Sequence, residues 1–419
     1  MKIYIKKMGC KVNEYEASSV ASALVKAGHE IVDNPVDASI SIVFTCAVTS
    51  EAEKKSRQAV GSINKKNKNN KVIVCGCSSQ INPDDYLKKE NVILVLGTAD
   101  KMKIVELISD ITHQEQKKLI EELPKDYEFY EVPEFNKTRH FVKIQDGCNK
   151  FCSYCIIPYL RGRSRSRDKG EIINEIIYAS TISKEVVITG IDVSDYKTKD
   201  GENLNDLIMA LKNIQIRLRI SSVECNIINE EFLQNLKELK DFCPHFHLPL
   251  QSGSNDVLKS MNRHYTTDKF LEKINLIRQH FPNCAITTDL IIGYPTETDE
   301  NFNETCETLR RANFADIHAF KYSLRPNAFT KTMEQLDSSV VNSRQAKILK
   351  IKKETHDNFI KANLNLEAEV LFEQVKGDYI LGYSKNYIKV YLPKNMANID
   401  DIKKVILIEP YSDGCLAKL

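Results

Sequence analysis

The chain has 419 residues, of which 42% are hydrophobic and 28% charged, the composition of an ordinary globular protein with two or three domains. A formal net charge of only +2 excludes nucleic-acid binding through overall charge, so any such contact must come from local basic patches. The first residues, MKIYIKKMGC, lack the apolar stretch of a signal peptide, and no apolar run is long enough to span a membrane. We therefore expect a cytoplasmic protein without membrane contact. In that compartment, clustered cysteines more often bind metal than form disulfides.

The first hundred residues alternate between strand and helix patterns. The expected strands are 2–6, 39–45, 71–74 and 91–96, and the expected helices are 14–26 and 51–63. This rhythm predicts a doubly wound α/β domain with a parallel sheet over residues 1–112. Residues 113–135 are highly charged and contain two prolines, which indicates an interdomain linker.

The alternation resumes in residues 136–360. Strands are expected at 141–145, 185–189, 217–223, 246–250, 285–292 and 316–322, with helices between them such as 171–180 and 267–280. Six such units predict a partial (β/α)6 barrel, whose active site would lie at the carboxyl ends of the strands. Residues 361–419 carry short strand patterns with turn residues, at 367–374, 379–383, 387–391 and 405–408, which predict a small β-barrel.

A compact cysteine motif follows the first strand of the expected barrel. Cys148, Cys152 and Cys155 lie in GCNKFCSYC with C-x3-C-x2-C spacing. Three thiolates can hold three irons of a four-iron, four-sulfur cluster and leave the fourth iron open to another ligand. The alternative is structural zinc, which prefers four protein ligands, and no second CxxC or HxxxH motif is nearby in the sequence. The pattern favours the cluster.

A second group of cysteines is dispersed in sequence. Cys10, Cys46 and Cys77 each follow an expected strand of the first domain, so a parallel sheet would bring them to the same edge. They could hold a second cluster with one open iron, or be ordinary half-buried thiols. Strand alternation puts Cys75 on the same side as Cys77. Cys75 is therefore an alternative third ligand, and we favour Cys77 for this role because it follows Gly76, which permits a turn.

Motifs in the same order along nearly the whole chain resemble the radical S-adenosylmethionine (SAM) methylthiotransferase family. They are GCKVNEYE (9–16), TCAVT (45–49), KSRQ (55–58), KIQDGC (143–148), CIIP (155–158), RGRSRS (161–166), HLPLQSGS (247–254) and MNR (261–263). The last sixty residues are similar to a TRAM domain, an RNA-binding β-barrel. Phe44, Cys225 and Tyr294 depart from the family pattern, and none of them is a candidate cluster ligand.

The resemblance implies an enzyme with two 4Fe-4S clusters, SAM and a tRNA substrate. Cys148, Cys152 and Cys155 would hold the cluster that cleaves SAM to a radical, and Cys10, Cys46 and Cys77 an auxiliary cluster that carries sulfur. The GCKVNxYE form resembles the branch that methylthiolates carbon 2 of N6-threonylcarbamoyladenosine at position 37 of tRNA. Alternatives are isopentenyladenosine in tRNA, a ribosomal protein, or a non-catalytic RNA-binding protein with a structural metal. The family further implies an electron donor of the flavodoxin or ferredoxin type.

Several residues remain open between a functional and a structural role. Candidates for SAM contact are Tyr154, Gln251, Ser252 and Asp289, although turn or strand-end chemistry would also explain them. For His245 and His247 we expect a place in the core or in hydrogen bonds rather than metal ligation. Two basic patterns suit either RNA contact or internal pairing: Arg161, Arg163, Arg165 and Arg167, and the alternation of Lys385, Tyr387, Lys389 and Tyr391. The sequence offers no catalytic residue beyond the cluster ligands.

Overall fold

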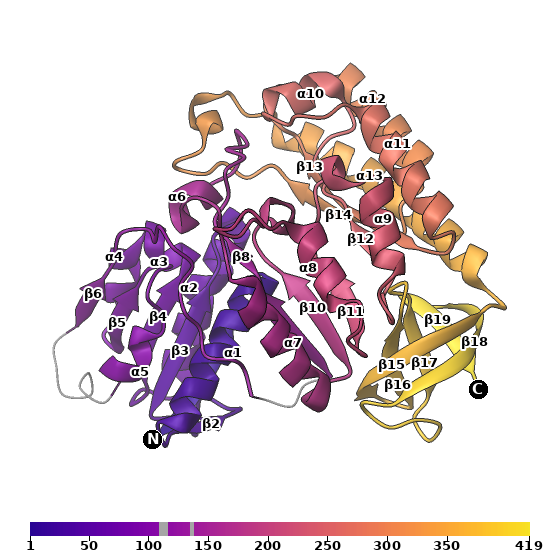
Figure 1. Cartoon of the computed structure of the whole chain (residues 1–419). Helices are drawn as coiled ribbons and strands as arrows, with labels where there is room; N and C mark the ends of the chain where they lie inside the picture. Colours follow the sequence, from indigo (N-terminus) through magenta and orange to yellow (C-terminus); the bar gives the residue numbers. More distant parts are fainter. Residues whose placement is uncertain (109–115, 135–137) are drawn as a thin grey trace.

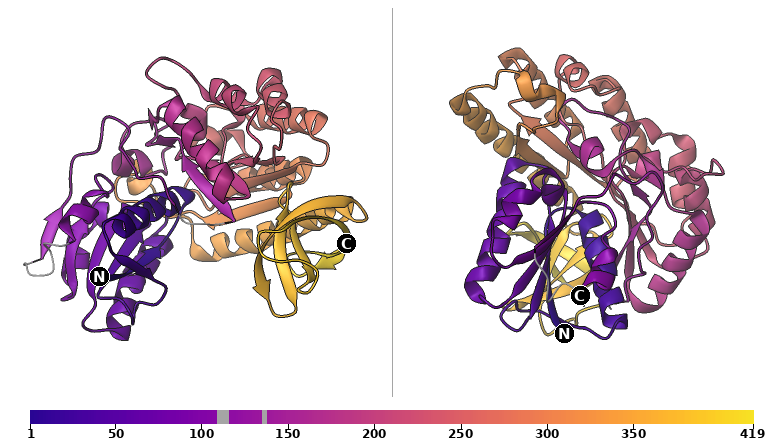
Figure 2. Two further views of the ribbon diagram at one scale, coloured as in Figure 1. Left: turned by 60° about the horizontal axis from the view of Figure 1, so that its bottom comes forward. Right: turned by 90° about the vertical axis from the view of Figure 1, so that its left-hand side faces the viewer.

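The computed structural model describes residues 1–108, 116–134 and 138–419. An N-terminal α/β domain lies at one side of a larger curved α/β core, and a β-barrel at the end of the chain lies against the other side (Figure 1). The two rotated views show the same arrangement, with the curved core next to both the N-terminal domain and the C-terminal barrel (Figure 2). In the described residues, no helix has both the length and the apolar character needed to cross a bilayer.

The N-terminal domain is built on a parallel sheet. Over the described residues, the strand order is β2-β1-β3-β4-β5-β6. Its strands are β1 (Lys2–Lys7), β2 (Glu30–Val32), β3 (Ile40–Thr45), β4 (Lys71–Gly76), β5 (Val92–Leu96) and β6 (Lys117–Leu119). Its helices are α1 (Lys11–Lys26), α2 (Ser50–Lys66), α3 (Cys77–Ile81), α4 (Pro83–Leu87) and α5 (Lys103–Leu107). Ile42 packs in the hydrophobic cluster that includes α1, whereas the next residue, Val43, packs in the cluster that includes α2. Both sheet faces are therefore covered, which confirms the doubly wound prediction.

Two strands of this sheet were not expected. β2 pairs with β1, and β6 pairs in parallel with β5 although it lies inside the predicted linker, residues 113–135. Strands of three residues are too short for an alternation pattern to be recognised. Residues Lys117–Leu119 of the expected linker thus extend the N-terminal sheet. Both ends of that linker overlap residues 109–115 and 135–137, which are outside the described part of the chain.

The core contains parallel sheets with strand orders β11-β10-β7 and β12-β13-β14. The strands are β7 (Arg139–Lys143), β10 (Glu185–Thr189), β11 (Arg217–Ile220), β12 (His245–His247), β13 (Ala285–Ile292) and β14 (Asp316–Lys321), with a small hairpin of β8 (Gln145–Asp146) and β9 (Arg165–Ser166). The helical elements are α6 (Ile157–Arg161), α7 (Lys169–Ile182), η2 (Val193–Asp195), α8 (Leu204–Leu211), η3 (Cys225–Ile227), α9 (Glu230–Lys237), α10 (Asn255–Ser260), α11 (Thr267–His280), α12 (Asp299–Ala312), η4 (Phe329–Thr332) and α13 (Ser338–Asn363). One hydrophobic cluster includes residues of both sheets, so the strands curve around a common core as a partial barrel. This confirms the predicted architecture.

The C-terminal strands close into a barrel in the order β15-β16-β17-β19-β18. They are β15 (Glu367–Lys376), β16 (Tyr379–Ser384), β17 (Lys389–Pro393), β18 (Ile402–Tyr411) and β19 (Gly414–Lys418). The small β-barrel was predicted, but β19 was not. β17 begins two residues later than expected because Tyr387 adopts a left-handed conformation, with φ of 66°, in the turn after β16.

Candidate active site

The compact cysteine motif lies on a loop at the carboxyl end of β7. Cys152 is buried, and Cys148 and Cys155 are half-buried. Cys155 interacts electrostatically with both other thiols, and Cys148 with Cys152, so the three lie together. The backbone N–H of Lys150 donates to Cys148 Sγ at 3.4 Å, and that of Ile157 donates to Cys155 Sγ at 3.5 Å. Donors placed on these sulfurs favour the thiolate form that metal binding requires.

The donor set fits an iron–sulfur cluster. Burial raises the pKa of the Cys148 and Cys155 thiols to about 12, so a cation is needed to hold them as thiolates at neutral pH. Soft thiolate ligands suit iron–sulfur clusters or zinc, and three ligands leave one iron of a four-iron cluster open.

Arg263 and Asn262 hold this loop from the side of α10. Arg263 Nη1 donates to Cys152 Sγ at 3.4 Å, while its Nη2 donates to both carboxylate oxygens of Glu224 at 2.7 and 2.8 Å. The side-chain amide of Asn262 donates to the carbonyls of Lys150 and Phe151 at 3.2 and 3.1 Å. In the sequence these two residues stand out only as part of the MNR motif. Their pairing with the cysteine loop joins segments more than 100 residues apart, which spacing alone does not reveal.

The second group of thiols lies at the carboxyl edge of the N-terminal sheet. Cys10 caps α1, Cys46 follows β3 and Cys77 opens α3 after β4. Cys46 interacts electrostatically with both Cys77 and Cys10, so the parallel sheet does bring the three together. Burial raises the pKa of Cys46 to about 11. As in the first group, the donor set is three thiols, and the buried Cys46 needs a nearby cation to ionise at neutral pH.

Close backbone packing shapes this second group. Gly9 has φ of 90°, and a Cβ there would lie 2.7 Å from Cys46 Sγ, so only glycine fits beside that sulfur. Cys77 packs with Ile156 of the core, at the contact between the two domains. Cys75, the competing candidate, is fully buried in the hydrophobic cluster on the α1 side of the sheet with Phe44. Cys77 therefore remains the proposed third ligand.

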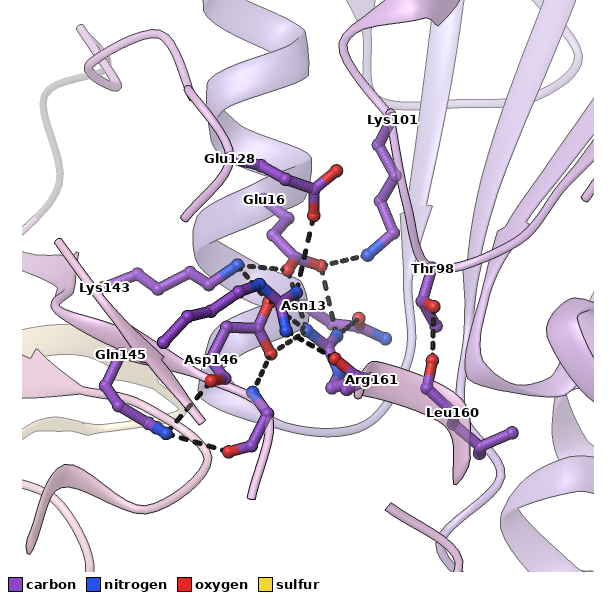
Figure 3. A network of polar contacts seen from close by, with 12 residues as sticks. Asn13, Glu16, Thr98, Lys101, Glu128, Lys143, Gln145, Asp146, Leu160 and Arg161 are labelled. Carbon is purple, nitrogen blue, oxygen red and sulfur yellow. Dashed lines mark hydrogen bonds and ion pairs between the residues drawn. The ribbon is translucent and has the colours of Figure 1, made fainter. Parts of the chain in front are cut away.

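A buried network of charges joins the N-terminal domain to the core (Figure 3). Glu16 of α1 accepts hydrogen bonds from Lys101 and, at 2.7 Å, from Lys143 of β7. Arg161 of α6 donates to Glu16 at 2.9 Å and to Asp146 at 3.0 Å, and Lys143 also donates to Asp146 at 2.6 Å. Burial by itself raises the pKa of Glu16, but Arg161, Lys101 and Lys143 together hold it well below its usual range. Both carboxylates are therefore ionised and paired inside the protein.

This network connects both cysteine groups. Asp146 precedes Cys148 by two residues, and Arg161 also interacts with the Cys77 thiol. Arg161 Nη2 donates to Asn13 Oδ1 at 3.1 Å, and the Asn13 amide donates to the carbonyl of Thr45, next to Cys46, at 2.9 Å. A rigid set of hydrogen bonds thus fixes the loops that carry the two groups relative to one another.

A cavity of about 1140 Å³ lies between the inner face of the core strands, the start of α1 and the C-terminal barrel. Cys10 lines it, together with Thr189 at the end of β10, Asp289 of β13, His318 of β14 and Tyr387 of the barrel. All three parts of the chain contribute to its wall. It is large enough for a nucleoside, and one of the second-group thiols opens onto it.

Histidines and carboxylates form a hydrogen-bonded chain in this cavity. His247 Nε2 lies 3.3 Å from Asp289, and His318 bonds to Asp289 through Nδ1 at 3.2 Å and to Asp316 through Nε2 at 3.5 Å. These two carboxylates raise the pKa of His318 to about 9. Placed between these two carboxylates, His318 is held as an imidazolium. His247 Nδ1 also contacts Thr287 Oγ1 at 2.9 Å, the hydrogen-bonded role expected for it.

His245 has the same kind of role. Its Nε2 contacts Thr287 Oγ1 at 3.0 Å, and its ring stacks on that of Tyr387 with centroids 4.6 Å apart. It joins the core to the C-terminal barrel.

The other SAM candidates lie apart from the cavity wall. Tyr154 packs beside Met261 and Tyr294. Ser252 is fully buried and its Oγ accepts the N–H of Ser254 at 3.2 Å, which holds the turn. Gln251 has φ of 65°, and its backbone bonds to both neighbours in β13, Asp289 and Ile291. For Tyr154, Gln251 and Ser252 the SAM contact stays a prediction, as it does for Asp289.

Internal pairing accounts for most of the two basic patterns. Arg161, Arg165 and Arg167 are buried and pair with acidic residues of the interior, whereas Arg163 is exposed and lies over the ring of Phe151 at 4.4 Å. In the barrel, Lys385 pairs with Asp241 at 2.6 Å, Lys389 pairs with Asp413 at 3.0 Å, and Tyr391 is buried. The alternation of charge at these positions therefore reflects packing between elements.

Comparisons with known proteins agree with this geometry. Residues 142–309 match the Radical SAM superfamily, and residues 2–97 match the Uncharacterized protein family UPF0004. The chain is 33% identical to the threonylcarbamoyladenosine tRNA methylthiotransferase MtaB of Bacillus subtilis, over 97% of this chain and 94% of that protein. It is also 33% identical to the tRNA-2-methylthio-N(6)-dimethylallyladenosine synthase of Thermodesulfovibrio yellowstonii, over 96% of this chain and 95% of that protein.

A solved structure extends the comparison to the fold. The radical SAM methyltransferase TsrM of Kitasatospora setae superposes with a TM-score of 0.60 at 12% identity, over 79% of this chain and 76% of that one. At this identity the likeness concerns the fold alone, which is the α/β arrangement described above.

Proposed function

The chain belongs to the radical SAM tRNA methylthiotransferase family, whose cofactors are SAM and 4Fe-4S clusters, and from this premise we propose its substrate and the residues that serve the reaction. The proposed reaction is transfer of a methylthio group to carbon 2 of N6-threonylcarbamoyladenosine at position 37 of tRNA. The observation that carries this proposal is the pair of three-thiol groups joined by one buried charge network, with Cys10 opening onto a cavity of nucleoside size.

In this proposal each thiol group holds one cluster. Cys148, Cys152 and Cys155 hold the first, and Cys10, Cys46 and Cys77 hold the auxiliary one. Bound at these residues, the first cluster would supply the one-electron chemistry that SAM requires, and the auxiliary cluster would supply the sulfur. Arg263 is a positioning residue in this scheme, because its Nη1 donates to Cys152 Sγ while its Nη2 donates to the Glu224 carboxylate, which fixes the guanidinium.

The cavity is the proposed site for the target adenosine. Its wall includes Cys10, so a base bound there would lie against the auxiliary group. The stacked rings of Tyr387 and His245 close the side of the cavity toward the C-terminal barrel, which supports a role for that barrel at the tRNA entrance. tRNA and SAM are the proposed partners, with a flavodoxin- or ferredoxin-type electron donor and a cytoplasmic site of action.

A second candidate substrate is isopentenyladenosine in tRNA. The observation that favours it is the match to relatives named as tRNA-2-methylthio-N(6)-dimethylallyladenosine synthases over almost the whole chain. Both candidates require the same reaction at carbon 2 and differ only in the group on N6.

Mass spectrometry of tRNA nucleosides from a strain lacking the gene distinguishes the candidates. We expect the methylthio form of threonylcarbamoyladenosine to be lost in this strain. The wild-type gene should restore it, and a gene encoding the Cys10→Ala variant should not. Loss of the methylthio form of isopentenyladenosine would transfer the proposal to the second candidate. An unchanged nucleoside profile would refute both.

A further inference from the structure

Among the residues that the structure describes, one lysine of the cavity lacks a partner of opposite charge. Lys352, Lys353 and Lys389 also line the cavity, and each is held by a carboxylate: Lys352 by Asp316 at 2.9 Å, Lys353 by Asp357 and Lys389 by Asp413 at 3.0 Å. Lys11 lines the same cavity and is exposed to it, yet it makes no ion pair or side-chain hydrogen bond with any residue that the structure describes. Its amino group is available to a ligand.

The acidic residues around Lys11 are already engaged. Glu185 and Asp289 act on Lys11 electrostatically without pairing with it. Glu185 accepts hydrogen bonds from Arg219 at 3.0 and 3.2 Å. Asp289 lies between His247 and the His318 imidazolium. Because these carboxylates have their own cations, Lys11 has no carboxylate partner among the residues that the structure describes, and its positive charge favours an anionic ligand.

Lys11 is also in the right place relative to the proposed sulfur site. It is the first residue of α1 and directly follows Cys10, which lines the same cavity. In adenine, carbon 2 and the substituent on N6 lie on the same edge of the base, separated by N1 and C6. A base whose carbon 2 faces Cys10 therefore directs its N6 substituent toward the residues beside Cys10.

We propose that Lys11 is the specificity-determining residue of the cavity and binds the carboxylate of an N6-threonylcarbamoyl group. The inference rests on the proposed function and adds to it the residue that recognises the N6 substituent of the substrate. The threonine part of this group carries a free carboxylate, which a lysine ammonium pairs with by a charge-assisted hydrogen bond. An apolar isopentenyl group would instead leave the Lys11 amine desolvated and unpaired, which disfavours that substrate.

A substrate-and-variant cycle on the reconstituted holoenzyme tests the inference. The substrates are one tRNA carrying threonylcarbamoyladenosine and the same tRNA with that carboxylate converted to its methyl ester. The enzymes are the wild type, Lys11→Gln, Lys11→Ala and Lys11→Arg. Lys353→Gln is the matched control, because it removes a cavity lysine whose charge Asp357 already balances. The readout is the ratio of kcat/KM for the acid to that for the ester, which a general loss of cluster activity leaves unchanged.

We expect the wild type, Lys11→Arg and Lys353→Gln to prefer the acid by about 10- to 100-fold, the range for a hydrogen bond between charged groups. Lys11→Gln and Lys11→Ala should lose most of this preference. A Lys11→Gln or Lys11→Ala enzyme that keeps the full preference would overturn the inference and leave the proposed function standing. A wild type that turns over the acid and the ester equally would also overturn it. A wild type with no activity on threonylcarbamoyladenosine would refute the proposed function itself, and the role of Lys11 with it.

Discussion

Arg161 of the core and Glu16 of the N-terminal domain form a bidentate pair in a fully buried site. Nη1 donates to Oε1 at 2.9 Å and Nη2 donates to Oε2 at 3.2 Å. The two residues are 145 positions apart in the sequence and are nearly inaccessible to solvent. This pair fixes the distance between the two proposed cluster sites, because Arg161 also contacts the loops of both.

Removing one partner of this pair should destabilise the protein strongly. We expect Glu16→Gln to lower the free energy of unfolding by about 3–5 kcal/mol, because Arg161, Lys101 and Lys143 would then share too little negative charge in the interior. Urea denaturation followed by circular dichroism measures the change. The control is Lys88→Gln, which breaks an exposed ion pair with Asp85 and should leave the unfolding midpoint nearly unchanged. An unchanged midpoint for Glu16→Gln would show that the network is not structural.

Each thiol group should account for half of the iron. After anaerobic reconstitution we expect about eight irons per chain, and about four in a Cys10→Ala, Cys46→Ala, Cys77→Ala triple variant, because each four-iron cluster is removed with its ligands. The corresponding triple variant of Cys148, Cys152 and Cys155 should also hold about four irons and should no longer cleave SAM.

The control for the iron measurements is Cys284→Ala, which removes a cysteine of the hydrophobic core and should retain the full iron content. Stoichiometric zinc without iron in the wild type would contradict both assignments.

A methyl group at Gly9 should selectively disturb the auxiliary site. In Gly9→Ala the new Cβ would lie 2.7 Å from Cys46 Sγ, so we expect loss of about four irons after reconstitution. Gly28→Ala is the matched control. Gly28 also has positive φ, 85°, but nothing lies within 4 Å of the place its new methyl group would take, so this variant carries the backbone strain alone. Equal iron content in the two variants would argue against a cluster beside Cys46.

The imidazole of His318 should make folding stability dependent on pH. Its carboxylate partners raise its pKa from the ordinary value of 6.5 to about 9, so the folded protein binds the proton more tightly than the unfolded chain does. The stability gained from this proton is complete below pH 6.5 and is lost as the pH rises through about 9. The groups that face His318 are Asp289 of β13, Asp316 of β14 and His247 of β12, and Lys352 of α13 reaches Asp316.

Urea midpoints of the wild type and His318→Asn between about pH 6 and pH 10 measure this contribution. We expect the wild-type advantage to be largest at the acidic end of this range and to decrease steadily toward the alkaline end. His264→Asn, which removes an exposed histidine, controls for the general effect of losing an imidazole. A difference that increases with pH would contradict the protonated state of His318.

Much of the fold could be predicted because the relevant patterns are local. The strands β10 and β13 and the helix α11 have the bounds that the sequence predicted. The two strands are continuous, mostly buried runs, and α11 buries residues at helical spacing, so each has a recognisable start and end. The strands β2 and β6 were missed because three residues carry no period. The strand β19, only five residues long, was also missed, and it forms a hairpin with β18 directly before it.

The chain by itself determined the chemistry available to this protein, and the tertiary structure decided how it is arranged. Three thiols within eight residues, and three more at successive strand ends, follow from spacing and from the parallel order of the sheet. The sequence does not show which charged residues pair with one another, because packing brings together residues that are more than a hundred positions apart. Only the folded chain therefore distinguishes Arg161, which is buried between two carboxylates, from Lys11, which lines the cavity and forms no ion pair with any residue that the structure describes.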